Sequence, residues 1–258
     1  MANCVELLSI ENVPEYLKSN PYLTCGFRRC STAKECVLSL RVWSISQWSA
    51  ITSCVVFFYG LCLAGLSTTL PADSPAALRA VVLAMAVNAM LHSVPSAGYH
   101  IFGEAVGMGR AVFFFWQRLD FAMIHVSAIP LAYALCVGAS HRRPHLWWLE
   151  RVSCPLAAAL SIAVIRAGPS IRTPSQRVLV ISLLVLIYML PVFSVWVYDP
   201  LSLQAVIGAV IAGALVYVMH FPECHSPNHW FGSHALMHVC LQIAFFAELA
   251  FAVLGVVS

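Results

Sequence analysis

The sequence contains few charged residues: 14 Lys or Arg and 11 Asp or Glu, together 10% of 258 residues. A soluble globular domain carries about 25% charged residues, so this composition excludes an ordinary soluble protein. The net charge of +3 is small and scattered, which argues against nucleic acid as a partner. Because 60% of the residues are hydrophobic, we predict an integral membrane protein.

Three further signals are missing from the sequence. There are no ten-residue stretches of alternating polarity, which excludes a transmembrane β-barrel. The first forty residues contain no early apolar core, so we expect no cleavable signal peptide. The H-E-x-x-H signature of metalloproteases is also missing, because Ala235 follows His234.

Long apolar runs separated by breaks rich in Pro, Gly and Ser predict transmembrane helices, each of which needs about 20 residues. We place seven spans near residues 44–66, 77–101, 119–138, 146–166, 178–198, 202–221 and 234–257. The predicted fold is therefore an all-α seven-helix membrane bundle. A cytosolic tail of residues 1–43 precedes a membrane domain of residues 44–258.

The distribution of basic residues predicts the orientation of these spans. With a cytosolic N-terminus, ten basic residues lie on the cytosolic side: Lys18, Arg28, Arg29, Lys34, Arg41, Arg110, Arg118, Arg166, Arg172 and Arg177. Four lie on the opposite side: Arg79, Arg142, Arg143 and Arg151. Basic residues favour the cytosolic side, so we predict a cytosolic N-terminus and a C-terminus outside or in a lumen. The Arg142-Arg143 pair favours the opposite orientation, because it places two basic residues on the side that is not cytosolic.

Polar residues cluster at the predicted cytosolic ends of three spans. His234 and His238 open the last span, and their spacing of four residues places both imidazoles on one helix face. Ser96 and His100 close the second span, and Asp120 opens the third. Imidazoles are costly in lipid unless they have partners, so this convergence predicts a functional site.

The chemistry of these residue types predicts a metal site. Catalytic zinc usually has three protein ligands and one open position, and His100, His234 and His238 supply three imidazoles. Bound zinc lowers the pKa of a coordinated water to about 7. Asp120 would accept a proton, orient the water or bond a ligand histidine, and Ser96 would stabilise an oxyanion.

A less specific interpretation competes with the metal site for any histidine taken alone. A single histidine in a membrane span usually forms a hydrogen bond to a neighbouring helix. We assign this role to His92, His125 and His220. His225 and His229 are also four residues apart, but Pro227 lies between them and predicts a loop.

The motifs Ser96-x-x-x-His100, Leu119-Asp120-Phe121 and Ser233-His234-x-x-x-His238 resemble those of the progestin and adipoQ receptor family, relatives of bacterial hemolysin III-like proteins. Further similar elements are Tyr22-Leu23-x-x-Gly26-Phe27-Arg28, Cys36-Val37-Leu38-Ser39-Leu40, Trp48 and Pro222-Glu223. The resemblance implies seven helices, a cytosolic N-terminus and zinc held by His100, His234 and His238. It also assigns the motif aspartate to Asp120 and the motif serine to Ser96.

The sequence departs from the resembled motifs in two places. Residues 41–50 lack the acidic and histidine members of the stretch that enters the first span. After His100, Gly103-Glu104-Ala105 replaces the usual Cys-His-Ser. The three histidines are retained, so the resemblance supports metal binding more strongly than any particular substrate or hormone.

The resemblance implies either ceramidase-like amide hydrolysis or a receptor role. The leading hypothesis is an intramembrane zinc hydrolase that acts on a lipid amide such as ceramide. The alternatives are a receptor for a steroid or an adiponectin-like ligand, with structural zinc, or a scaffold. Expected partners are the lipid bilayer, a ceramide-like or steroid ligand and an extracellular protein, without ordinary G-protein coupling. We expect the plasma membrane, the Golgi or another endomembrane as the location.

Overall fold

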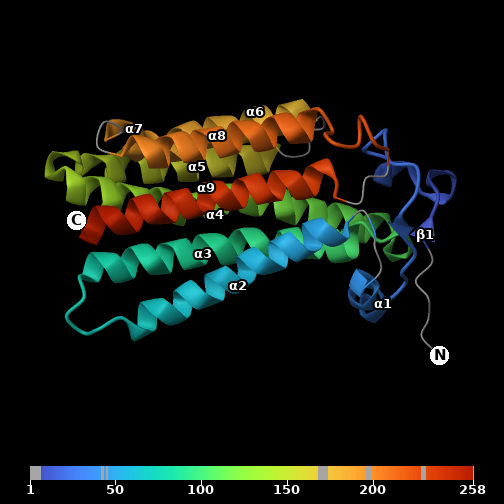
Figure 1. Cartoon of the computed structure of the whole chain (residues 1–258), viewed down its shortest axis with the longest axis horizontal. Coiled ribbons are helices and arrows are strands. Elements are labelled where there is room, and N and C mark those ends of the chain that lie inside the picture. Colours follow the sequence, from blue (N-terminus) through green and yellow to red (C-terminus); the bar gives the residue numbers. More distant parts are fainter. Residues whose placement is uncertain are drawn as a thin grey trace. The chain divides into compact units, whose positions relative to one another are not determined.

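The structure is a computed structural model that describes residues 7–41, 44, 46–167, 174–195, 199–227 and 231–257. Its principal elements are α-helices (Figure 1). The N-terminal elements are β1 (Leu7–Leu8), η1 (Ile10–Asn12), η2 (Glu15–Leu17), β2 (Phe27–Arg28), α1 (Ala33–Leu38) and η3 (Ser39–Arg41). Next come α2 (Gln47–Thr69), α3 (Ala76–Gly98), the π-helical turn η4 (Tyr99–Gly103), η5 (Val106–Met108) and α4 (Arg110–Arg142). The remaining elements are η6 (Pro144–Leu146), α5 (Trp148–Ala167), α6 (Pro174–Tyr188), α7 (Leu190–Ser194), α8 (Pro200–Val218) and α9 (Ser233–Val257).

The chain divides into two compact units. Unit 1 consists of Met1–Val55, Ser93–Asp120 and Ala212–Cys240. Unit 2 consists of Val56–His92, Phe121–Ile211 and Leu241–Ser258. The helices α2, α3, α4, α8 and α9 each contribute residues to both units.

Unit 1 is built around the N-terminal segment. Strands β1 and β2 pair antiparallel, with Leu7 opposite Arg28. Leu8 and Leu17 are buried in one apolar cluster with Phe113 of α4. The ring of Tyr16 lies 5.1 Å from that of Phe113, a separation typical of favourable aromatic pairs. The predicted cytosolic tail is therefore folded against the beginning of α4.

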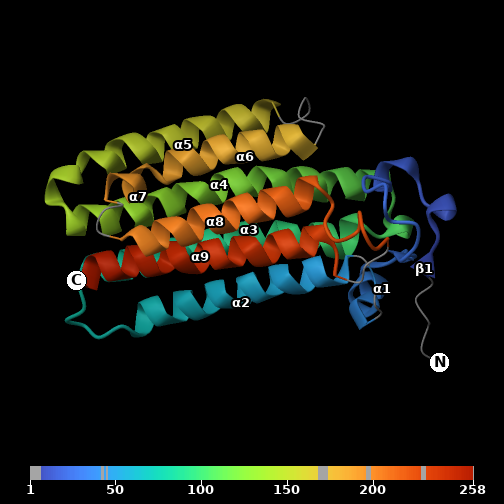
Figure 2. The same cartoon turned by 45° about the horizontal axis from the view of Figure 1, so that its top comes forward.

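Unit 2 is a bundle of helical segments that run alongside one another (Figure 2). Helices α5 and α6 pack side by side in both views. Met85 of α3, Leu135 of α4, Leu184 of α6 and Phe251 of α9 are fully buried in one cluster. Small residues allow helices α4 and α9 to approach closely, as is common between membrane helices.

Gly138 marks this close approach and gives a direct test of the packing. A Cβ atom added to Gly138 would lie 2.8 Å from the Cα atom of Ala252 on α9. We expect Gly138→Leu to separate the helices and to destabilise the protein by about 1–3 kcal/mol or more. Thermal unfolding in detergent measures the loss. Gly208→Leu is the control, because nothing lies within 4 Å of a Cβ there. Equal melting temperatures for the two variants would contradict the packing.

Six helices in the described part of the chain are long and apolar enough to cross a bilayer: Gln47–Thr69, Ala76–Gly103, Arg110–Arg142, Pro144–Ala167, Pro200–Val218 and Ser233–Val257. The span expected near residues 178–198 is represented by α6 and the short α7. Pro191 lies at the start of α7, where its missing N–H favours a helix start over a helix interior. Residues 196–198 of this expected span lie outside the described residues.

Helix α4 begins earlier than the sequence predicts. We expected the third span to begin near residue 119, but α4 starts at Arg110 and includes 33 residues. The additional turns contain an aromatic run whose members pack on the N-terminal segment, and Arg110 lies over the ring of Phe114. Asp120 therefore lies within a helix and not at its beginning.

Candidate metal centre

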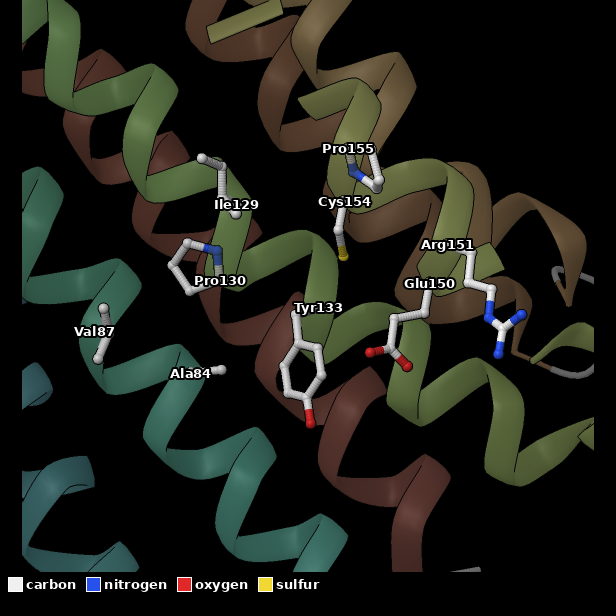
Figure 3. Close-up of a pocket in the computed structure, with 9 residues that line it drawn as sticks. All are labelled: Ala84, Val87, Ile129, Pro130, Tyr133, Glu150, Arg151, Cys154 and Pro155. Carbon is white, nitrogen blue, oxygen red and sulfur yellow. The ribbon is translucent and has the colours of Figure 1, made fainter. Parts of the chain in front are cut away.

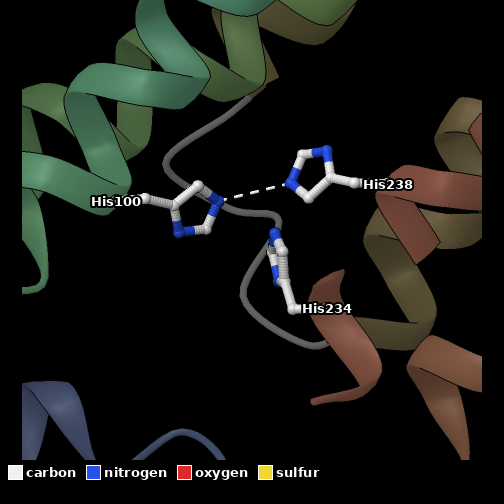
Figure 4. Close-up of side chains that lie close together, drawn as sticks. All are labelled: His100, His234 and His238. Carbon is white, nitrogen blue, oxygen red and sulfur yellow. Dashed lines mark hydrogen bonds between the residues drawn. The ribbon is translucent and has the colours of Figure 1, made fainter. Parts of the chain in front are cut away.

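Three histidines from two separate stretches of the chain converge in unit 1. His100 lies in the π-helical turn η4, which follows α3, while His234 and His238 lie in the first two turns of α9. The imidazoles point toward one another (Figure 4). One ligand atom from each residue lies within 4.8 Å of the other two. His100 is 1% exposed and His238 7%, so these rings sit in a largely water-excluded site.

The distance between two ring nitrogens fits a shared tetrahedral ion. The Nε2 atoms of His100 and His238 are 3.3 Å apart. Two nitrogens bound to one tetrahedral zinc at about 2.05 Å are separated by about 3.3 Å. The ring centroid of His234 lies 4.7 Å from that of His100 and 4.9 Å from that of His238. The donor set therefore fits a borderline-soft divalent ion such as zinc.

A buried glutamate holds the beginning of α9, and with it two of the histidines. Glu223 is 2% exposed and accepts hydrogen bonds from the backbone N–H of Ser233 at 2.8 Å and from its Oγ at 3.0 Å. It also accepts a bond from Nδ2 of Asn20 at 3.2 Å. An acidic group at a helix N-terminus satisfies free N–H groups and complements the helix dipole. Glu223 thus ties the N-terminal segment to the helix that carries His234 and His238.

A buried arginine holds the turn that carries His100. Arg28 is fully buried, and its guanidinium group makes five hydrogen bonds, as many as it has N–H groups. The acceptors are the hydroxyls of Ser39 (2.7 Å) and Ser46 (3.1 Å) and the carbonyls of Cys36 (3.3 Å), His100 and Ile101 (3.2 Å). Burial lowers the pKa of Arg28, although the nearby Glu104 carboxylate opposes this effect. The N-terminal segment therefore fixes the backbone on which His100 is mounted.

The structure also places a carboxylate beside His100. Oε2 of Glu104 lies 2.9 Å from Nδ1 of His100. Burial acts to raise the pKa of Glu104, but His100, His234 and Arg28 outweigh it, and the net effect lowers the pKa. In the sequence, Glu104 stands out only as a departure from a motif. Its spacing of four residues from His100 was the signal that could have identified it, since this spacing places side chains on one helix face.

The two other predicted site residues also belong to unit 1. Ser96 of α3 is 1% exposed, and its Oγ lies 3.0 Å from the Oγ of Ser53 on α2. Asp120 is half-buried on α4 and lies outside the three-histidine cluster of ligand atoms. The structure therefore brings the three predicted metal ligands together. The catalytic roles of Ser96 and Asp120 stay predictions.

The histidines assigned to other roles lie outside the cluster. Both ring nitrogens of the buried His125 are without a hydrogen-bond partner among the described residues, while its carbonyl accepts a bond from Ser161 Oγ at 2.7 Å. The ring of His220 lies beside that of Tyr22, with centroids 5.9 Å apart and planes tilted by 57°. Nδ1 of His225 lies 2.9 Å from the sulfur of Cys224. His229 lies outside the described residues.

A groove of about 540 Å³ belongs entirely to unit 2 and contains none of the three histidines. Its walls come from α3, α4 and α5 (Figure 3). The lining includes two helix prolines, Pro130 and Pro155, and two charged residues, Glu150 and Arg151. The metal chemistry therefore has to be sought at the histidines and not in this groove.

Comparison with known proteins shows the family of the chain. Residues 39–249 match the haemolysin-III related family. The chain is 24% identical over 256 residues to the mouse protein "Progestin and adipoQ receptor family member 3", covering 91% of this chain and 81% of the relative. It is 26% identical over 129 residues to the human protein of the same name, covering 48% of this chain and 40% of the relative. The family match contains His100, His234 and His238, and the chain belongs to the haemolysin-III related family of membrane proteins, together with these progestin and adipoQ receptor relatives.

Proposed function

We propose that this chain is a zinc-dependent multi-pass membrane hydrolase that cleaves the amide of a ceramide-like lipid in the plasma membrane or the Golgi. The observation that carries the proposal is the convergence of three imidazoles whose ligand atoms lie within 4.8 Å of one another. Three histidines form the protein ligand set of a known class of catalytic zinc site. When bound, zinc would supply a Lewis acid and lower the pKa of a coordinated water to about 7.

We assign one role to each of the predicted site residues. His100, His234 and His238 would hold the ion. Asp120 accepts a proton and returns it to the leaving amine, the usual work of a general acid and base. The hydroxyl of Ser96 exchanges its bond with Ser53 for one to the substrate oxygen, on which negative charge develops. The apolar character of the membrane helices suits the acyl chains of a lipid substrate.

We also propose that the chain crosses the membrane seven times, with α6 and α7 together as the fifth span. The N-terminal tail of residues 1–43 is then cytosolic, residues 44–258 form the membrane domain, and the C-terminus is outside or in a lumen. Ten of the fourteen basic residues lie on the cytosolic side in this topology, which supports the orientation. The metal centre then lies toward the cytosolic ends of the helices.

The role of Asp120 can be tested by an isosteric substitution. We expect Asp120→Asn to retain zinc and to lower ceramide turnover by about 10²–10⁴-fold, because an amide cannot accept the proton. Zinc content and release of fatty acid from ceramide would be measured on the same detergent-purified sample. Asp73→Asn, in the exposed turn between α2 and α3, is the control. Loss of zinc from Asp120→Asn would make Asp120 a ligand or structural group and contradict the proposed role.

A receptor with structural zinc is the second candidate function. The name of the mouse and human relatives and the deep burial of His100 and His238 favour it. A structural site has a closed coordination sphere, whereas a catalytic site keeps an exchangeable position. Azide added to the cobalt-substituted protein distinguishes the two. A change in the visible spectrum supports the hydrolase, and an unchanged spectrum supports the receptor.

A further inference from the structure

The two nitrogens of the His100 ring face different partners. Nδ1 lies 2.9 Å from Oε2 of Glu104, while Nε2 faces Nε2 of His238 at 3.3 Å. A carboxylate only accepts hydrogen bonds, so Nδ1 must carry the hydrogen of this contact. In the neutral ring, the lone pair is then on Nε2, the nitrogen that faces the other histidines. Glu104 therefore selects the form of His100 that can bind a metal.

The backbone around Glu104 holds this contact in place. The backbone N–H of Glu104 donates to the carbonyl of Tyr99 at 3.0 Å, five residues earlier, which is the bonding pattern of a π-helical turn. Such turns are rare and frequently occur at functional sites. Within this turn, Arg28 binds the carbonyls of His100 and Ile101. His100 and Glu104 thus lie on one short segment whose backbone is held by hydrogen bonds.

His100 and Glu104 differ in how far their side chains are exposed to solvent. The side chain of His100 is 1% exposed, whereas that of Glu104 is 26% exposed. The carboxylate contacts Nδ1 of His100 and not Nε2, the nitrogen that faces His238. A carboxylate behind a metal-binding histidine fixes the ring and raises the basicity of the ligand nitrogen, and removing such a group costs about 10–100-fold in metal affinity.

We propose that Glu104 is a positioning residue that orients His100 through Nδ1 and thereby sets the metal affinity of the centre. This inference rests on the metal site of the proposed function. It assigns a role to a residue in the stretch where the chain departs from the motifs it resembles. Glu104 acts through His100 and does not itself contact the ion.

The test is the zinc affinity of purified full-length protein, measured by competition with a chromophoric chelator. We expect Glu104→Ala to bind zinc about 10–100-fold more weakly than the wild type. Glu104→Gln should be intermediate, because its amide oxygen still accepts the Nδ1 hydrogen but carries no charge. The control is Glu15→Gln, which removes a carboxylate that is 89% exposed in the same unit and paired with Lys18.

Two further measurements distinguish a positioning role for Glu104 from a purely structural role and from direct ligation of the ion. The metal-free melting temperatures of the Glu104 variants should match that of the wild type, which a merely structural role would not allow. The visible spectrum of cobalt-substituted Glu104→Gln should keep the intensity of a tetrahedral site, because the ligand set is unchanged. A collapse of that intensity would identify Glu104 as a direct ligand and overturn the proposal.

The results also distinguish a failure of the role of Glu104 from a failure of the proposed function. Wild-type protein that binds no zinc overturns both. Wild-type protein that binds zinc, together with Glu104→Ala of equal affinity, overturns only the role of Glu104. Weaker zinc binding by Glu104→Ala, with unchanged metal-free stability and an intact cobalt spectrum, supports the proposal.

Discussion

Protein with both His234→Ala and His238→Ala is expected to contain no zinc, whereas wild-type protein is expected to contain about one zinc ion per chain. The two rings come from the same face of α9 and supply two of three ligand atoms that lie within 4.8 Å of one another. His100 alone cannot retain the ion, because structural and catalytic zinc sites use at least three protein ligands. Metal content of detergent-purified protein, measured by mass spectrometry, checks the result.

The control for this pair is His141→Ala/His145→Ala. These two histidines are also four residues apart, but they are exposed and lie in unit 2. The control should keep its zinc, and both variants should keep their helical content. Zinc that persists in the His234→Ala/His238→Ala protein would leave the cluster as a helix-packing contact. In that case a receptor or scaffold role without zinc at these histidines would take precedence over the hydrolase.

Arg28→Ala is expected to cause the largest loss of stability among single substitutions in the N-terminal segment. The change removes all five donors from a fully buried site and leaves the carbonyls of Cys36, His100 and Ile101 without this partner. Each buried acceptor left unsatisfied costs about 1–3 kcal/mol. The resulting cavity adds a further penalty. We expect a sharp drop in the melting temperature. We also expect weaker zinc binding, because the backbone of His100 loses its hydrogen bond from Arg28.

The neighbouring arginine provides the control. Arg29 is exposed, so Arg29→Ala should change the stability by no more than about 0.5 kcal/mol. Arg28→Lys should not rescue the site, because one ammonium group cannot reach acceptors that surround a planar guanidinium. Thermal unfolding of the three variants in one detergent gives the comparison. A fully stable Arg28→Lys protein would show that charge alone suffices and that the five-bond geometry is not needed.

The sequence predicted the convergence of the three histidines more accurately than the bounds of the helices. His100, His234 and His238 could be found because the spacing of their segments places them at one end of a helical bundle. The early start of α4 could not be found from hydropathy, since Arg110 and Arg118 lower the apolar signal there. What favours helix in that stretch is tertiary packing of its aromatic residues on the N-terminal segment. Local sequence carries little information about such a contact.

The residues that hold the histidines in place were predicted least well from the sequence. Glu104 was visible only as a motif departure, and Arg28 and Glu223 only as similar positions in a family pattern. Their roles depend on partners that are far away in sequence: Arg28 binds carbonyls 72 and 73 residues later, and Glu223 binds Asn20 at a separation of 203. Pairings of this kind follow from topology and not from spacing.

The separation of 138 residues between His100 and His238 has a consequence for biosynthesis. His100 leaves the ribosome long before the other two histidines of the cluster, which belong to α9. A three-ligand site therefore does not exist until α9 has been released and inserted beside its neighbours. A nascent chain that stalls before α9 would carry only one of the three histidines, so the proposed metal site could be filled only after α9 is in place.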